Sequence, residues 1–303
     1  MAAVIKESKT DRIFLLFTYL FLAIALLCVL YPLVYIVSAS ISSPTYVNSG
    51  EMWLLPKGIT FEGYQRVFEN QAIWRGYANT ILYTVVGTLV NLLVTIPAAY
   101  ALSRSDFVGR GFFMGMFLVT MFFGGGLIPT YLLVKELGLI NSMWALILPG
   151  AASVWNIIVA RTFFQSTIPK ELQEAAHIDG CTNLRLFWKI VIPLSSPIIA
   201  VMALFYGVGH WNSYFNALVY LNDEAKYPLQ MVLRQILVLQ EMNSSGIGTA
   251  TSGETAMAMN ARADVAALLK YAVIIISTLP IIAIYPFLQR YFVQGVMIGS
   301  VKG

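Results

Sequence analysis

Long apolar runs separated by short polar stretches make up most of the chain. Each run reaches the ~20 residues that an α-helix needs to cross a bilayer. The runs predict six transmembrane helices, at residues of about 13–37, 77–102, 112–134, 143–164, 197–220 and 265–287. The connecting segments leave no room for a large soluble domain. We therefore expect an all-α polytopic membrane protein whose residues 1–303 form a single transmembrane domain.

Composition supports a membrane protein and narrows its chemistry. Hydrophobic residues make up 58% of the chain and charged residues 11%, against roughly 45–50% and about 25% in soluble domains. The 15 acidic residues all fall in loops or at the ends of spans. Proton relays and intramembrane cation sites use buried carboxylates, so this distribution argues against a proton-coupled transporter, a pump or an intramembrane aspartyl protease.

The sequence contains no G-x-x-x-x-G-K-[ST] pattern, so we expect no ATP site on this chain. We also expect it to hold no metal and no cofactor. Cys28 and Cys181 do not form a disulfide framework and are expected to be free thiols. The net charge of +4 comes from single cations in the loops, without the basic stripe of a nucleic-acid-binding protein.

The distribution of cations predicts the orientation of the chain. Six spans place both termini on one side, and most Lys and Arg residues flank the spans on that side. By the positive-inside rule this face is cytoplasmic, which places the tail at residues 288–303 in the cytoplasm of a bacterial inner membrane. The opposite face carries fewer cations on two long loops, at residues of about 39–76 and 221–264.

The polar segment at residues 165–193, between the fourth and fifth spans, is predicted to contain a short docking helix. Pro169 suits the first helical position, Glu171 favours the positive N-terminal end, and Gly180 suits a left-handed cap at the other end. Residues spaced i, i+3 and i+4 form an apolar stripe whose alanines allow a partner to approach closely. The stripe consists of Leu172, Ala175 and Ala176.

This segment resembles the EAA loop of binding-protein-dependent ABC importer permeases. The family pattern is E-A-A, three residues, G, nine residues, I, one residue, then L-P, and only Ile192 departs from it here. The resemblance implies a type I permease fold and a coupling helix that contacts the ATPase subunit. It carries that role to Glu174, Ala175, Ala176, Asp179 and Gly180, and the apolar stripe adds Leu172 to the coupling candidates. The alternative is an ordinary amphipathic connector.

The resemblance also implies the partners: a second homologous permease, two copies of an ATPase subunit that hold ATP and Mg, and an external solute-binding protein. The stretch at residues 211–214 and the ending at residues 285–303 resemble carbohydrate importers, most closely the smaller permease of the maltose type. The ending is similar to the branch that handles larger oligosaccharides, the alginate importer among them. We expect an oligosaccharide substrate, alginate or another acidic oligosaccharide included.

Other functional classes remain open on the sequence alone. The chain could serve an ABC importer for a different substrate, or act as a standalone secondary transporter, a channel or a polytopic enzyme. A permease is expected to copurify with a second permease and an ATPase, whereas the other classes should be active alone.

The fifth predicted span has the side chains that a sugar pathway needs, namely aromatic faces for stacking and neutral hydrogen-bonding groups. In a continuous helix Gly207, His210, Trp211 and Tyr214 share one face, with Asn212 and Asn216 on an adjacent one. We take six residues as pathway candidates: His210, Trp211, Asn212, Tyr214, Asn216 and Asn156. The alternatives are a packing histidine at position 210, an interfacial anchor at Trp211, and interhelical hydrogen bonds for Asn156, as for Asn79 and Asn91.

A break is predicted inside the third span. Gly124, Gly125 and Gly126 are followed closely by Pro129, and this run interrupts regular helical bonding. The break predicts a gate hinge, with a kink caused by packing against a bulky neighbour as the alternative. The short loop from Arg104 to Arg110 either determines topology or touches the ATPase.

Overall fold

The computed structural model describes residues 8–244, 269–284 and 286, and these residues contain helices and no strand. Their contacts divide the chain into two compact units. Unit 1 comprises residues 1–70 and 235–276, and unit 2 comprises residues 71–234 and 277–303. The boundaries fall inside α14 (Leu229–Ser244) and inside the helix Leu269–Ile284.

Unit 1 begins with α1 (Lys9–Ser40), which a reciprocal capping box starts: Ser8 Oγ accepts from the Asp11 amide, and the Asp11 carboxylate accepts from the Ser8 amide. None of the residues in the apolar part of α1 is buried inside the chain. Only its last turn is buried, where Ser38 donates to the carbonyl of Leu54 at 2.6 Å. The short helices α2 (Pro44–Asn48) and α3 (Glu62–Glu69) follow.

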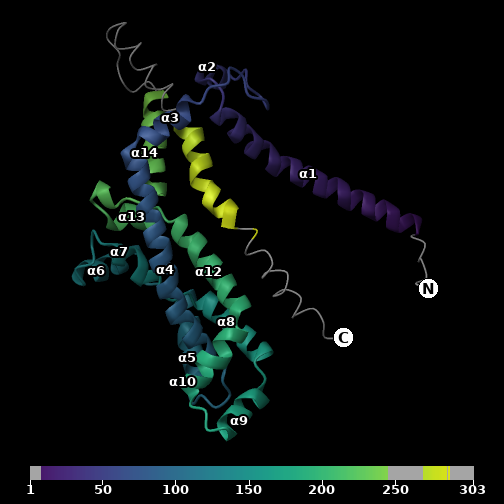
Figure 1. The fold of residues 1–303 in the computed structure, drawn as a ribbon, viewed down its shortest axis with the longest axis vertical. Helices are drawn as coiled ribbons and strands as arrows, with labels where there is room; N and C mark the ends of the chain where they lie inside the picture. Colours follow the sequence, from purple (N-terminus) through teal and green to yellow (C-terminus); the bar gives the residue numbers. More distant parts are fainter. Residues whose placement is uncertain (1–7, 245–268, 285, 287–303) are drawn as a thin grey trace. The chain divides into compact units, whose positions relative to one another are not determined.

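Unit 2 is arranged around the 33-residue helix α4 (Gln71–Ser103), which packs against α8 (Val154–Thr167) and α12 (Ser196–Trp211) (Figure 1). One hydrophobic core joins these three helices to the polar segment beyond α8. A second core joins α4 and α6 (Leu127–Glu136) to α7 (Met143–Ile147) and α13 (Phe215–Tyr220).

Two of the predicted spans, the third and the fourth, are bent helix pairs, and a further bent pair includes the start of the fifth span. The third span consists of α5 (Arg110–Phe122) and α6, which meet at 112°. The fourth consists of α7, the 3-10 turn η1 (Leu148–Gly150) and α8, with a bend of 51°. The prediction of a continuous fourth span is wrong, because Pro149 and Gly150 interrupt the helix there.

The fifth span is also interrupted. The segment from α10 (Asn183–Leu186) through the π-helical turn η2 (Phe187–Val191) and α11 (Ile192–Leu194) meets α12 at 79°. At its other end α12 stops at Trp211, so the predicted continuous helix over residues 197–220 is wrong. The side chain of Asn212 donates to the Val208 carbonyl at 3.0 Å, a local bond that competes with helix continuation.

The described residues contain two helices, α1 and α4, that are long and apolar enough to cross a membrane singly, or five spans if each bent pair counts as one. The helix Leu269–Ile284 lies within the sixth predicted span, but the rest of that span is almost entirely outside the described residues. Six spans therefore stays a prediction. The tail at 288–303 and residues 245–264 of the loop at 221–264 also lie outside the described residues.

Candidate functional site

The polar segment after α8 contains a three-turn helix, α9 (Lys170–Ile178), at one end of unit 2 (Figure 1). Pro169 is its N-cap and not the first helical residue, so α9 begins one residue later than the sequence predicted. At the other end Gly180 has φ +71°, the left-handed conformation that glycine adopts most readily. The Cys181 amide donates to the Ala176 carbonyl and the Gly180 amide to the His177 carbonyl, which is a Schellman cap.

The predicted apolar stripe of α9 is only partly available to a partner. Leu172 and Ala176 pack against the hydrophobic core of the chain itself. Glu174, Ala175 and Asp179 are exposed, and so is Ile178, whose exposed fraction of 86% is unusual for an isoleucine outside a span. The free face of α9 is therefore formed by Glu174, Ala175, Ile178 and Asp179. Ile178 was not predicted as part of the docking surface, because it does not follow the i, i+3 and i+4 spacing from Leu172 that defined the apolar stripe.

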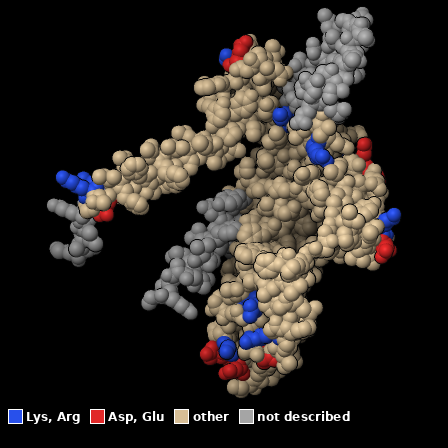
Figure 2. Space-filling model, turned by 180° about the vertical axis from the view of Figure 1, so that it is seen from behind, with Lys and Arg blue, Asp and Glu red and all other residues tan. Residues whose placement is uncertain are grey.

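Charged side chains gather at this end of unit 2, and the surface next to it is uncharged (Figure 2). One charged residue in this part of unit 2 is Arg104, in the loop between α4 and α5, for which the sequence left open a topology signal or a contact with the ATPase. Its Nε and Nη2 donate to the two oxygens of Asp106 at 2.8 and 2.5 Å, and its Nη1 donates to the Tyr100 hydroxyl at 3.2 Å. These hydrogen bonds raise the pKa of Arg104 and lower the pKa of the Asp106 carboxyl.

A second polar cluster lies among α4, α12 and the interruption between η1 and α8. Asn91 is fully buried, and its amide nitrogen donates to the carbonyls of Gly150 and Ala151 at 2.7 and 2.9 Å. The Asn91 oxygen lies 2.6 Å from Nε2 of His210. Because both amide hydrogens of Asn91 serve carbonyls, its oxygen must accept, so the His210 proton sits on Nε2.

A similar pair of hydrogen-bonding side chains lies one turn away, formed by Thr95, which follows Asn91 in α4, and Tyr206, which precedes His210 in α12. The Tyr206 hydroxyl shares a 2.6 Å hydrogen bond with Thr95 and accepts from the Ser153 amide at 3.2 Å. The two side-chain pairs, Asn91 with His210 and Thr95 with Tyr206, thus satisfy three backbone groups that the broken helix leaves unpaired. Irregular backbone inside a membrane is tolerated only where such partners exist. We call these four residues the polar layer.

Glycine allows α12 to approach α4 at the polar layer. Gly87 lies one turn before Asn91, and a Cβ there would come within 2.5 Å of His210 Nε2. Gly207 faces α4 in the same way, with Thr88 Oγ1 3.7 Å from the position of a Cβ. Gly87, Thr95 and Tyr206 were not predicted from the sequence as members of a site. A signal was present, because Gly87, Asn91 and Thr95 are spaced i, i+4 and i+8 on one face of α4.

The pathway candidates from the sequence do not share one surface. The proposed common face of Gly207, His210, Trp211 and Tyr214 is wrong, because the helix ends before Tyr214. Trp211 is 7% exposed and its indole nitrogen donates to the Ser277 carbonyl at 3.0 Å, with Tyr77 edge-to-face at 5.7 Å. Trp211 therefore has the contacts of a packing residue.

The remaining candidates lie apart from one another. Asn156 is buried in the first turn of α8. Asn212, Tyr214 and Asn216 are exposed around the α12–α13 junction, where the ring of Tyr214 lies 5.7 Å from the Arg234 guanidinium.

A pocket of about 420 Å³ lies in unit 2 among α4, α12 and the helix Leu269–Ile284. Trp211 and Gly207 line it, but its other lining groups are aliphatic except for Thr84 and Thr88. A sugar needs several convergent hydrogen-bonding groups. This pocket does not supply them.

The predicted interruption of the third span is confirmed at its expected place. Residues 123–126 are not helical, and Gly126 has φ +86°. A Cβ on Gly124 or Gly126 would meet no described atom within 4 Å, and one on Gly125 would meet only Pro129 at 3.9 Å. Among the described residues, no close neighbour therefore requires glycine at these three positions. Whether the bend acts as a gate hinge stays a prediction.

Comparison with known proteins gives a consistent result. Residues 71–298 match the family described as binding-protein-dependent transport system inner membrane component. Protein LplC of Bacillus subtilis is 44% identical, over 98% of this chain and 97% of the relative. The polygalacturonan/rhamnogalacturonan transport system permease protein YtcP of B. subtilis is 41% identical, over 97% of this chain and 99% of the relative.

A solved structure is also similar. A chain in the crystal structure of a bacterial ABC transporter involved in the import of the acidic polysaccharide alginate aligns with a TM-score of 0.84 and 37% identity. The alignment covers 95% of this chain and 100% of that chain.

Proposed function

Because this chain belongs to the family of binding-protein-dependent transport system inner membrane components, we propose that it is one of two different permease subunits of an ATP-driven oligosaccharide importer. The observation that carries the proposal is the family match together with the capped helix α9 in the predicted EAA segment. The chain performs no catalysis in this proposal. ATP and Mg bind to a separate ATPase, and a solute-binding protein delivers the substrate on the opposite side of the inner membrane.

An acidic oligosaccharide is the proposed substrate. Two of the similar proteins carry names or descriptions that specify uronic-acid polymers, polygalacturonan in one and alginate in the other. The described spans present no buried carboxylate that would repel such a substrate. Asn212, Tyr214 and Asn216 are the exposed candidates that would contribute to the pathway wall, with the second permease supplying the opposing wall. The bend at Gly124–Gly126 and Pro129 is the proposed gate hinge.

The first experiment is purification of the complex through a tag on this chain. We expect a second, homologous permease and two copies of an ATPase, and ATP hydrolysis that rises when the binding protein is loaded with short alginate oligosaccharides or short galacturonides. A homodimer of this chain would contradict the two-permease proposal. Stimulation by amino acids or metal ions, with none by either oligosaccharide mixture, would contradict the proposed substrate class.

The proposed coupling route runs through the free face of α9, which would contact the ATPase. In this arrangement ATP binding draws the coupling helices of the two permeases together, and the two bundles rock about a site near the middle of the membrane. Leu172 and Ala176 then fix α9 to its own subunit, while Glu174, Ala175, Ile178 and Asp179 meet the partner. The Gly180 cap sets the direction in which the chain leaves that surface.

Replacing Gly180 by valine is expected to lower substrate-stimulated ATP hydrolysis about tenfold, because a β-branched residue at φ +71° costs ~1–2 kcal/mol and displaces the end of α9. Insertion and assembly should survive. Gly138→Val is the matched control, since Gly138 has φ +68° and ends α6. If substrate stimulated ATP hydrolysis equally in Gly180→Val and Gly138→Val, the coupling role of α9 would be contradicted.

A further inference from the structure

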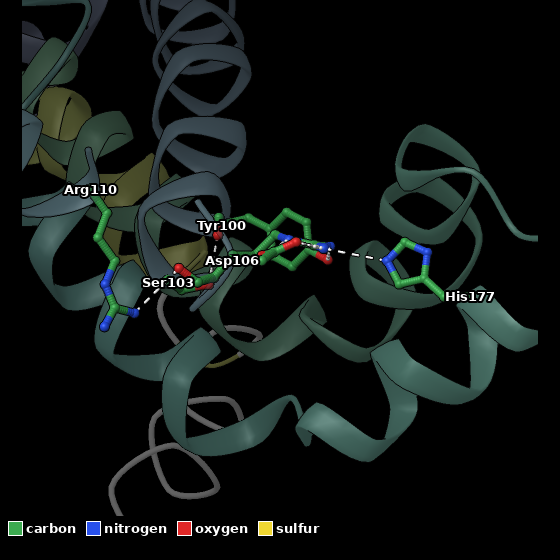
Figure 3. A network of polar contacts seen from close by, with 6 residues as sticks. Tyr100, Ser103, Asp106, Arg110 and His177 are labelled. Atoms are coloured by element: carbon green, nitrogen blue, oxygen red, sulfur yellow. Dashed lines mark hydrogen bonds and ion pairs between the residues drawn. The ribbon is translucent and has the colours of Figure 1, made fainter. Parts of the chain in front are cut away.

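Arg104 is 9% exposed, which is unusual for a cation whose role is only to retain a loop on one side of a membrane. Its guanidinium contacts three side chains at once: both oxygens of Asp106, the hydroxyl of Tyr100, and Nε2 of His177 at 3.5 Å (Figure 3). Tyr100 belongs to α4 and His177 to α9. One side chain therefore links the central helix of unit 2 to the proposed coupling helix.

Tyr100 supplies a second connection to the same region. Its ring lies 5.6 Å from the ring of Phe164 and 5.3 Å from that of Phe187. Phe164 is in α8, before α9, and Phe187 opens the π-helical turn after α10. The chain is thus held to α4 on both sides of α9, and Arg104 covers the Tyr100 ring at 5.9 Å.

The geometry of these contacts needs an arginine. A guanidinium is a planar fork with five donors, which can serve a carboxylate in bidentate fashion and still reach a phenol and an imidazole. A lysine ammonium carries the same charge but cannot reproduce that set of directions. Arginine nitrogens only donate, so in the 3.5 Å contact with His177 the guanidinium is the donor and Nε2 is the acceptor.

We propose that Arg104 is a positioning residue that makes α9 move with α4, so that rearrangement of the membrane helices reaches the ATPase contact. This inference rests on the proposed coupling role of α9. The route is continuous: Asn91 and Thr95 of the polar layer lie on α4, Tyr100 and Arg104 follow on the same helix and the loop after it, and His177 completes it on α9. Positive-inside topology alone requires only the charge of Arg104.

The experiment compares Arg104→Lys with Arg110→Lys in the purified complex in nanodiscs. Arg110 lies at the end of the same loop, and among the residues that the structure describes its Nη1 donates to the Arg104 carbonyl alone, at 3.3 Å. Spin labels at Val108→Cys and Lys170→Cys, in a chain with Cys28→Ser and Cys181→Ser, report the position of α9 relative to the loop. A second pair, Leu93→Cys with Val119→Cys, reports whether the helices stay packed.

We expect Arg104→Lys to broaden the distance distribution of the first pair and leave the second unchanged. Stimulation of ATP hydrolysis by the loaded binding protein should fall roughly three- to tenfold, and Arg110→Lys should behave as the wild type. His177→Gln, which retains an acceptor oxygen, should preserve the coupling that His177→Ala loses. The His177 pair also tests the inference if Arg104→Lys fails to assemble, because it leaves the Arg104–Asp106 ion pair intact.

Wild-type behaviour of Arg104→Lys in both measurements would overturn the inference and leave Arg104 as a topology determinant. An unchanged complex with Gly180→Val would instead refute the coupling role of α9 itself. The spin-label measurement needs no substrate, so an error in the proposed substrate class does not affect it.

Discussion

Replacing Gly87 by alanine is expected to lower the melting temperature of the complex by about 5–10 °C and to abolish most transport, because overpacking and a lost buried hydrogen bond together cost ~2–4 kcal/mol. The new Cβ would lie 2.5 Å from Nε2 and 2.6 Å from Cε1 of His210. If the His210 imidazole ring were free to rotate, it would move away from the new Cβ. This ring is held by the 2.6 Å hydrogen bond to Asn91, which is itself fixed by two carbonyls.

The control for this prediction is Gly209→Ala. Gly209 precedes His210 in α12, and a Cβ there would meet no described atom within 4 Å. We expect no loss of stability, since alanine is the better helix former by about 1 kcal/mol. Adding His210→Ala to Gly87→Ala removes the clashing ring and should recover part of the melting temperature. A double variant less stable than Gly87→Ala would show that the clash is not the cause.

Replacing Asn91 by leucine is expected to have the largest effect of any substitution considered, a loss of ~3–5 kcal/mol, because two buried carbonyls and one imidazole lose their partners. Leucine has the branched shape of asparagine but is larger, so no cavity is left and the loss comes from the missing hydrogen bonds together with some overpacking. The measurement is the melting temperature of the solubilised complex and the amount of subunit in the membrane. Asn91→Asp should fail as well, since a carboxylate offers no donor to the carbonyls of Gly150 and Ala151.

Thr95→Val is the matched control for Asn91. It removes one hydroxyl from the same face of α4, and the Tyr206 hydroxyl can still accept from the Ser153 amide. We expect a loss of about 1 kcal/mol. If Asn91→Leu were no more harmful than Thr95→Val, the account of how the helix break is stabilised would be wrong.

Local features of this chain could be predicted from its sequence. The cap at Gly180 and the break at Gly124–Gly126 depend on backbone preferences of a few neighbouring residues, and both lie where they were expected. The break at Pro149 and Gly150 also has a local signal that was overlooked. The end of α12 at Trp211 has a weaker local signal, because no proline or glycine follows it directly and only the Asn212 side chain, which donates to the Val208 carbonyl, competes with the helix.

The polar layer and the Arg104 contacts could not be predicted in the same way, because they depend on which helices become neighbours. Asn91 and His210 are 119 residues apart, and Arg104 and His177 are 73 apart. Asn91 was considered only as a possible interhelical hydrogen-bonding residue. The spacing of Gly87, Asn91 and Thr95 marks a face of α4 that needs a close polar neighbour, but it does not identify α12 as that neighbour.

The order in which the polar layer is synthesised has a consequence for membrane insertion. Asn91 leaves the ribosome before Gly150 and Ala151, so its amide can cover their carbonyls as soon as the bent fourth span enters lipid. The Ser153 amide must wait for Tyr206, which follows 53 residues later. During that interval the fourth span has one uncovered backbone group at its break. Its stable insertion is therefore expected to depend on the arrival of the fifth span, and a nascent chain truncated before Tyr206 should hold the fourth span less firmly in the membrane.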